Sequence, residues 1–262
     1  MSKPVVYIVH CIDTAGPLDQ STQAICELLQ STFGIAVQTK EEISALQKGN
    51  FNVLLRGGGG STHFDYGCGF GRAIPYFEQY KCIYYGCDIA QSCIDYISNN
   101  YPHINVKKLL KDDKIPFSSD SFDAVFCYGV FDACFQHIAL EEVLRVLKIG
   151  GVALITGKNN HYLDTDTMAK ETKIGARKNG HPNFFTDTKT LFNLLSSRNI
   201  NILHSRFFLE RKDNATDSYL TDMPDKFYTY AILIQKTQKS LLKPFQNFSV
   251  SKSQNFKIKE KK

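Results

Sequence analysis

Three glycines within one short segment constrain this chain more than any other feature. The segment Phe64–Arg72 reads FDYGCGFGR, with glycine at 67, 69 and 71, and it follows a short strand-like run. Glycine can adopt positive φ, and it lets a ligand come close to the main chain. Because the residues after Arg72 are typical of a helix, the segment predicts a strand–turn–helix corner that binds a nucleotide. A simple tight turn is the alternative for the glycines taken alone.

An acidic residue, Asp88, ends the next apolar run in the sequence GCDIA. A carboxylate at the tip of the second strand can accept hydrogen bonds from both hydroxyls of a ribose. Aspartate is also a good N-cap, and a helix pattern begins near Ala90. Its place one strand after the glycine turn favours the ribose role over capping.

Strand-like and helix-like stretches alternate from Ser61 onward, which predicts an α/β fold with a parallel sheet and helices on both faces. Two late strands have no helix pattern between them and are expected to pair antiparallel, giving a Rossmann-like, seven-stranded mixed sheet. The expected strands are 62–66, 82–88, 104–109, 122–128, 151–157, 200–209 and 227–235, and the expected helices are 72–80, 90–100, 138–147 and 186–198.

The chain divides into four parts. Residues 1–56 form a small strand–helix segment, 57–60 are a glycine linker, 61–235 are the main domain, and 236–262 are expected to be a basic disordered tail. Within the main domain, residues 158–185 form a polar insertion after the end of a strand. Loops in that position line the ligand crevice of open α/β sheets.

The basic balance of the chain belongs to its tail. The net charge is +5, but residues 236–262 hold eight Lys and one Glu, or +7, which leaves 5 − 7 = −2 for the rest. A nearly neutral body argues against nucleic acid as a partner. Eight cysteines without a CxxC pair indicate reduced thiols and a cytoplasmic location, and no apolar run is long enough to span a bilayer.

Further motifs follow in order: IPFSSDSFDAVF at Ile115–Phe126 and RVLKIGG at Arg145–Gly151. Together with the glycine turn and Asp88, they resemble the class I S-adenosylmethionine-dependent methyltransferases, over about residues 61–157. The resemblance implies S-adenosylmethionine as cofactor. No metal is expected, because the seven histidines include no HxxxH pair. The resemblance assigns the cofactor to a set of positions: Asp65, Gly67, Cys68, Gly69 and Gly71 around the methionine part, Asp88 on the ribose, Asp112 or Asp113 on the adenine amine, Ile89 against adenine, and Cys127 beside the cofactor.

No single residue is identified as the catalytic group. Methyl transfer depends mainly on alignment of the reactants, and a general base is needed only when the acceptor atom carries a proton. Candidates for the base or for acceptor contact are His137, His161, His181 and Tyr128. Each also has a simpler interpretation as a surface or packing residue, and Ala133 occupies the run where many relatives carry a histidine.

The acceptor is predicted from resemblance alone. A bias toward Lys, Asn, Ile and Phe is typical of AT-rich bacterial genomes. The chain resembles methyltransferases of capsule and surface-glycan gene clusters, including the O-methyl phosphoramidate type, which implies O-methylation of a small molecule or glycan precursor. The opening HCIDTAGPL is similar to polysaccharide deacetylases, but only Asp13 matches their metal ligands.

Two alternative functions are kept. An NAD-linked oxidoreductase would carry GxGxxG, whereas the spacing here is GxGxG. The second alternative is a non-catalytic interaction protein that retained the methyltransferase fold.

Overall fold

The computed structural model describes eleven stretches of the chain: residues 10–11, 51–52, 62–71, 74, 78, 83–110, 113–160, 167–178, 181–210, 219–237 and 244–250. In the N-terminal segment, β1 (His10–Cys11) pairs antiparallel with β2 (Phe51–Asn52). The expected helices of residues 1–56, the glycine linker and most of the helix 72–80 lie outside the described residues.

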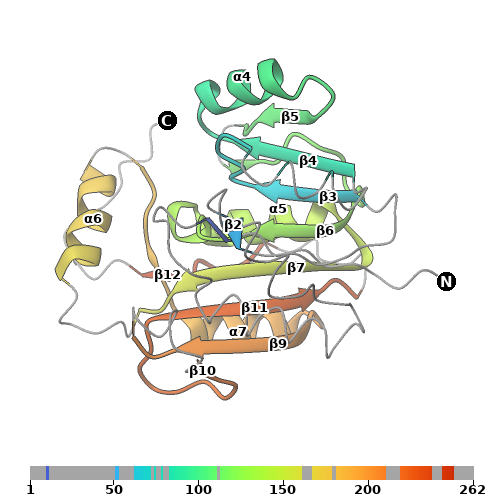
Figure 1. Cartoon of the computed structure of the whole chain (residues 1–262). Helices are drawn as coiled ribbons and strands as arrows, with labels where there is room; N and C mark the ends of the chain where they lie inside the picture. The colour runs from blue at the N-terminus through green and yellow to red at the C-terminus, as the bar shows by residue number, and fades with distance from the viewer. Residues whose placement is uncertain are drawn as a thin grey trace.

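All seven expected strands form one mixed sheet (Figure 1). They are β3 (Thr62–Tyr66), β4 (Ile83–Asp88), β5 (Asn105–Lys108), β6 (Phe122–Cys127), β7 (Leu147–Lys158), β9 (Asn201–Phe208) and β11 (Thr229–Gln235). A two-residue strand, β10 (Tyr219–Leu220), extends one edge, so the sheet has eight strands in the order β10-β9-β11-β7-β6-β3-β4-β5.

The strand directions follow the expected pattern. The neighbours β5, β4, β3, β6 and β7 are parallel, whereas β11 lies between β7 and β9 and is antiparallel to both. The α/β Rossmann-like fold is therefore confirmed. The carboxyl ends of the parallel strands share one end of the sheet, where such folds bind their ligands.

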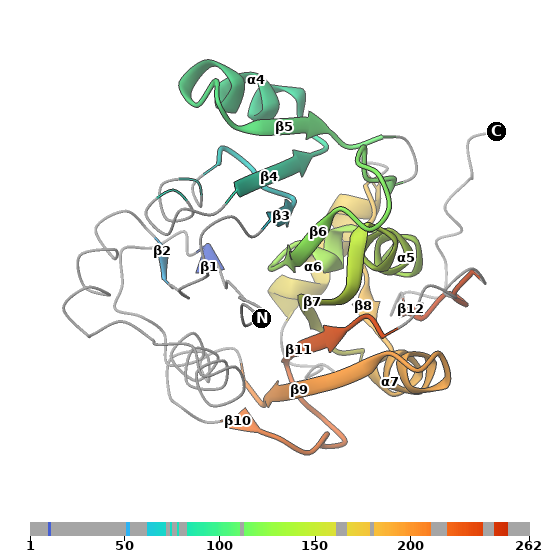
Figure 2. The same ribbon diagram turned by 90° about the vertical axis from the view of Figure 1, so that its right-hand side faces the viewer.

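The central strands are apolar along almost their whole length because both of their faces are covered. In β6 every residue from Ala124 to Cys127 is buried. Figure 2 shows α5 (Gln136–Val146) and α7 (Thr188–Ser197) on one face of the sheet. Their inward residues, Val143, Leu144, Leu191 and Leu195, belong to the main core with residues of β6, β7 and β11. Helix α4 (Gln91–Asn100) follows β4 at the other edge.

The polar insertion 158–185 is not one long loop. It contains α6 (Thr167–Lys178), and the short strand β8 (Phe185–Thr186) closes it. The sequence of this helix shows no clear apolar stripe, because the side chains that it buries include Lys173 and Arg177. Periodicity therefore did not predict it. Its Met, Ala, Lys and Glu residues nevertheless favour a helix intrinsically.

The expectation of a disordered tail over 236–262 is wrong for residues 244–250. There β12 (Ser249–Val250) pairs antiparallel with β8, and Phe245 and Phe248 belong to the main core. The composition of residues 236–262 is polar on average, so it did not indicate that these two aromatic residues are buried. Burial of aromatic side chains favours an ordered segment. Residues 238–243 and 251–262 lie outside the described part.

No helix in the described part of the chain is long and apolar enough to cross a membrane. The same part holds no cluster of three or more His, Cys, Asp or Glu side chains that could bind a metal ion.

Candidate functional site

The glycine turn follows the carboxyl end of β3, as predicted. The φ angles of Gly67, Gly69 and Gly71 are 81°, 52° and 70°, values that residues other than glycine rarely adopt. The amides of Gly67 and Cys68 both donate to the carbonyl oxygen of Cys87 at 2.9 Å, so the turn is fixed to the end of β4. A Cβ at Gly67 would lie only 2.6 Å from a methyl carbon of Val130, which comes from the loop after β6.

Asp88 ties the turn to the start of α4. Its Oδ2 accepts from the amide of Gly69 at 2.9 Å, and its Oδ1 accepts from the amide of Ala90 at 2.8 Å. Asp88 thus has a local structural role at the start of α4, although the N-cap position itself is Ala90. Each carboxylate oxygen accepts about two hydrogen bonds, so both oxygens retain capacity for the hydroxyls of a ribose.

Two large apolar side chains flank this carboxylate at the surface. Ile89 is 63% exposed and Leu110 is 54% exposed. They follow the ends of the paired strands β4 and β5, and the amide of Leu109 donates to the carbonyl of Asp88 at 2.8 Å. Leu110 was not among the predicted site residues, and its only sequence signal is its place just after the third strand.

Asp65 is the last residue but one of β3 and is partly buried. Its Oδ2 accepts from the hydroxyl of Tyr84 at 2.9 Å. Burial raises the pKa of Asp65 to about 7, the Tyr84 hydrogen bond opposes this, and nearby Asp88 adds to it. Near neutral pH, this carboxyl group is therefore poised between its two protonation states.

Asp113 has a structural partner. Its side chain is buried, its φ is 59°, and its Oδ2 accepts from the amide of Phe135 at 2.8 Å. This hydrogen bond holds the loop before β6 to the start of α5. Asp112, the other candidate for the adenine contact, lies outside the described residues.

The thiols around the site are buried and protonated. Cys68 and Cys127 are 7% and 0% exposed, and burial raises the pKa of both thiols far above neutrality. Neither thiol is a nucleophile in this environment. Cys127 ends β6, next to Tyr128, which is partly buried.

The candidate histidines are not gathered at the turn. His137 is on α5, and burial lowers its pKa although Glu141 and Asp113 oppose this. His181 is exposed, and its amide donates to the carbonyl of Ala176 at 3.0 Å. Within the described residues, no hydrogen bond joins either histidine to the glycine turn, and His161 lies outside them.

An ionic cluster that the sequence did not predict lies beyond the carboxyl ends of β6 and β7. Asp132, in the short helix η2 (Phe131–Ala133), accepts from Lys158 Nζ at 3.0 Å and lies 3.1 Å from Lys173 Nζ. Burial raises the pKa of Asp132, but the two ammonium groups outweigh burial and bring it below its usual value. The cluster joins β6, β7 and α6 at the end of the sheet that carries the glycine turn.

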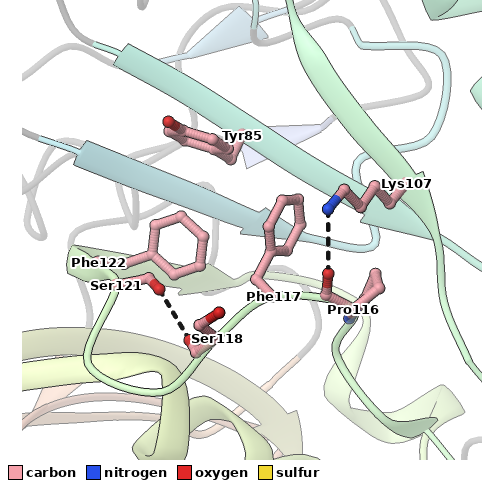
Figure 3. A pocket seen from close by; sticks show the side chains of 7 residues that line it. All are labelled: Tyr85, Lys107, Pro116, Phe117, Ser118, Ser121 and Phe122. Carbon is pink, nitrogen blue, oxygen red and sulfur yellow. Dashed lines mark hydrogen bonds between the residues drawn. The ribbon is translucent and has the colours of Figure 1, made fainter.

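A separate pocket of about 300 Å³ lies away from this end (Figure 3). The rings of Tyr85, Phe117 and Phe122 contact one another there, with centroids 5.2–5.6 Å apart. Lys107 Nζ lies 4.6 Å from the ring centroid of Phe117. The pocket borders the start of β6 and shares no residue with the glycine turn, so it is not the cofactor site.

Comparison with known proteins identifies the domain. Residues 64–155 match the protein family described as "Methyltransferase domain". A tRNA (carboxymethyluridine(34)-5-O)-methyltransferase of Arabidopsis thaliana is 29% identical over 126 residues, or 45% of this chain and 29% of that protein. This chain thus spans less than a third of the length of that relative.

Solved structures agree on the fold. An S-adenosylmethionine-dependent methyltransferase from Mesorhizobium loti is similar with a TM-score of 0.52 and 17% identity, covering 68% of this chain and 92% of that one. Another, from Methanosarcina mazei, has a TM-score of 0.50 and 18% identity, covering 70% and 95%. The chain has the Rossmann-like fold of these methyltransferases, and residues 64–155 match a methyltransferase domain family. This match and this fold imply S-adenosylmethionine as the cofactor.

Proposed function

We propose that this chain is an S-adenosylmethionine-dependent methyltransferase that methylates an oxygen atom of a small molecule or surface-polysaccharide precursor. One observation carries the cofactor assignment. The positive-φ glycine turn is tied by the Gly69 amide to Asp88, and the exposed residues Ile89 and Leu110 follow the ends of the paired strands β4 and β5. This corner fits a ribose and a flat base, with room for a close approach to the main chain.

The residues of the corner bind and orient rather than react. Asp88 would hold the ribose, Ile89 and Leu110 would cover the base, and the glycine turn would admit the methionine part near Asp65. S-adenosylmethionine supplies an electrophilic methyl group on a sulfonium with a neutral leaving group. The protein then mainly aligns the acceptor and excludes water. No general base is assigned, because no hydrogen bond described in the structure joins His137 or His181 to the glycine turn.

A thermal-shift measurement tests the cofactor assignment against the dehydrogenase alternative. We expect S-adenosylhomocysteine to raise the melting temperature and NAD to leave it unchanged, since a ligand stabilises the folded state that binds it. The opposite result would reject the proposal. Transfer of a labelled methyl group to any acceptor would exclude the non-catalytic alternative.

The acceptor is proposed from the resemblance to methyltransferases of capsule and surface-glycan gene clusters. The most specific acceptor that this resemblance suggests is a capsular phosphoramidate or another glycan precursor. The Arabidopsis relative, by its printed name, methylates an oxygen, which supports O-methylation. The same name makes tRNA a second candidate acceptor. The charge of −2 outside residues 236–262 favours the small acceptor over nucleic acid. The eight cysteines without a CxxC pair favour a cytoplasmic enzyme.

A labelled-methyl assay with four acceptor pools separates these possibilities: nucleotide-linked sugars, phosphoramidate precursors, small metabolites and total tRNA. We expect incorporation into a small-molecule pool and none into tRNA. Incorporation into tRNA alone would replace the proposed acceptor class.

A further inference from the structure

The guanidinium of Arg177, in the last turn of α6, is buried without a carboxylate partner among the described residues. Its side chain is only 8% exposed, and its Nε has no hydrogen-bond partner. Its Nη1 donates to the carbonyl of Asn183, which uses only a small part of its donor capacity. Buried charges are ordinarily paired, because removing an ion from water is costly. Arg177 departs from this rule.

The electrostatic surroundings of Arg177 add to the departure. Lys173, which is 3% exposed, is on the same helix one turn earlier, and Asp132 is already shared by Lys173 and Lys158. Burial lowers the pKa of Arg177, and none of the described carboxylates is recorded as opposing this effect. A cation at a helix C-terminus gains from the helix dipole, but such residues are normally exposed, as the neighbouring Lys178 is.

A continuous set of contacts joins Arg177 to the proposed cofactor corner. The guanidinium carbon lies 5.8 Å from the ring centroid of Phe184, and the Phe184 amide donates to the carbonyl of Asp132 at 2.8 Å. Asp132 follows Val130, whose side chain packs against Gly67. Figure 1 shows α6 beyond the end of β7, at the end of the sheet where the parallel strands terminate. An acceptor of the methyl group must approach from this end.

We propose that Arg177 binds an oxyanion, a phosphate or carboxylate group carried by a small-molecule acceptor. The planar fork of a guanidinium matches either group with two parallel hydrogen bonds. The buried ammonium of Lys173 adds positive charge nearby. The anion would therefore neutralise a guanidinium that has no counter-charge among the described residues. This assignment rests on the proposed methyltransferase function and narrows its acceptor class.

The test compares Arg177→Met with its exposed neighbour Lys178→Met. Thermal melts are recorded with saturating S-adenosylhomocysteine, in sodium phosphate, sodium acetate or sodium chloride at equal pH and ionic strength. We expect phosphate or acetate to raise the melting temperature of the wild type and of Lys178→Met, but not of Arg177→Met. By calorimetry, the Kd for the active anion should rise at least about tenfold in Arg177→Met. Whether phosphate or acetate raises the melting temperature distinguishes an acceptor that carries a phosphate from one that carries a carboxylate.

A second measurement separates binding from a structural role. If Arg177 awaits a ligand, Arg177→Met in chloride should melt at or above the wild-type temperature, because an uncompensated buried charge has been removed. A large loss of stability in chloride would show a structural arginine and overturn the proposal. So would an equal anion response in Arg177→Met, no response beyond chloride in the wild type, or binding of tRNA alone.

Arg177→Lys keeps the proposal falsifiable if the methionine variant does not fold. It retains the charge and loses the fork, so it should give a smaller anion response than the wild type, and an equal response would overturn the assignment. The S-adenosylhomocysteine shift serves as the independent control. Its absence in the wild type would contradict the cofactor assignment, whereas its presence without an anion response contradicts only the oxyanion site.

Discussion

Asp88 combines a structural and a proposed binding role in one carboxylate. We expect Asp88→Ala to weaken S-adenosylhomocysteine binding by about 1–3 kcal/mol, because charge-assisted hydrogen bonds to the ribose are lost and the Gly69 amide loses its acceptor. Isothermal titration calorimetry measures the effect. Asp95→Ala is the control, since Asp95 lies on the exposed face of α4 and accepts only from Gln91 among the hydrogen bonds described. An unchanged Kd in Asp88→Ala would place the ribose elsewhere.

Asp65 should give the protein a specific pH dependence. Its pKa of about 7 in the folded state exceeds the usual value of 3.8, so the folded protein holds this proton more tightly than the unfolded chain does. The stabilising contribution is therefore complete below about pH 4 and is lost as the pH rises to about 7. Asp65→Asn is always neutral and can still accept from Tyr84.

The melting temperature of Asp65→Asn, relative to the wild type, should consequently be higher at pH 7.5 than at pH 4.5. Taking this difference removes the effects of groups common to both proteins, such as buried His63, whose pKa is lowered to about 3. Asp95→Asn should show no such trend. A constant difference between wild type and Asp65→Asn across this range would contradict the raised pKa.

At the scale of elements, the segment 244–250 makes the next prediction. Phe248 is 2% exposed and its ring is stacked on that of Phe131, with centroids 6.2 Å apart. Phe248→Ala should destabilise the protein by about 3–5 kcal/mol, as loss of a buried phenylalanine does. Urea unfolding measures it, and Phe70→Ala, at a 49% exposed phenylalanine, should change stability far less. Equal effects of the two would show that the segment is not part of the core.

The elements that the sequence predicts best are those with clear apolar patterns. The seven strands and helices α4, α5 and α7 were expected within a few residues, because buried strands and amphipathic helices produce distinct periodicities. Helix α6 was not predicted, because the residues it buries include Lys173 and Arg177. The ordered segment 244–250 was not predicted, because its two buried phenylalanines lie among polar neighbours.

The candidate site likewise has features that the sequence predicted and features that it did not. The glycine turn and Asp88 could be predicted because their chemistry depends on local sequence, in a turn and at a strand end. Leu110 and the Asp132–Lys158–Lys173 cluster depend on which strand ends lie side by side, and that information is contained in the sheet order. Asp113 was predicted, as an alternative to Asp112, from a motif position, and the structure adds a hydrogen bond from the Phe135 amide to its carboxylate that the motif did not indicate.

Across the whole molecule, the two halves of the sheet have different proposed roles. The ends of β3, β4 and β5 are the proposed cofactor corner, and the ends of β6 and β7, near α6, are the side from which an acceptor is proposed to approach. Val130 joins the halves by packing against Gly67. The cofactor side is built from backbone turns and one carboxylate, whereas the other side depends on buried ions, which makes its stability sensitive to the loss of a single charge.

Asp132→Asn tests this dependence. Removing the charge leaves Lys173, at 3% exposure, with only Asn183 and the Phe184 carbonyl as described acceptors. Breaking one side of a buried ion pair should destabilise the protein by about 3–5 kcal/mol in urea unfolding. Asp225→Asn removes a surface partner of Lys189 and should cost less than about 1 kcal/mol. Titration with S-adenosylhomocysteine confirms that the cofactor corner is still folded in both variants. If Asp132→Asn unfolds at the same urea concentration as Asp225→Asn, the cluster does not hold α6 to the sheet.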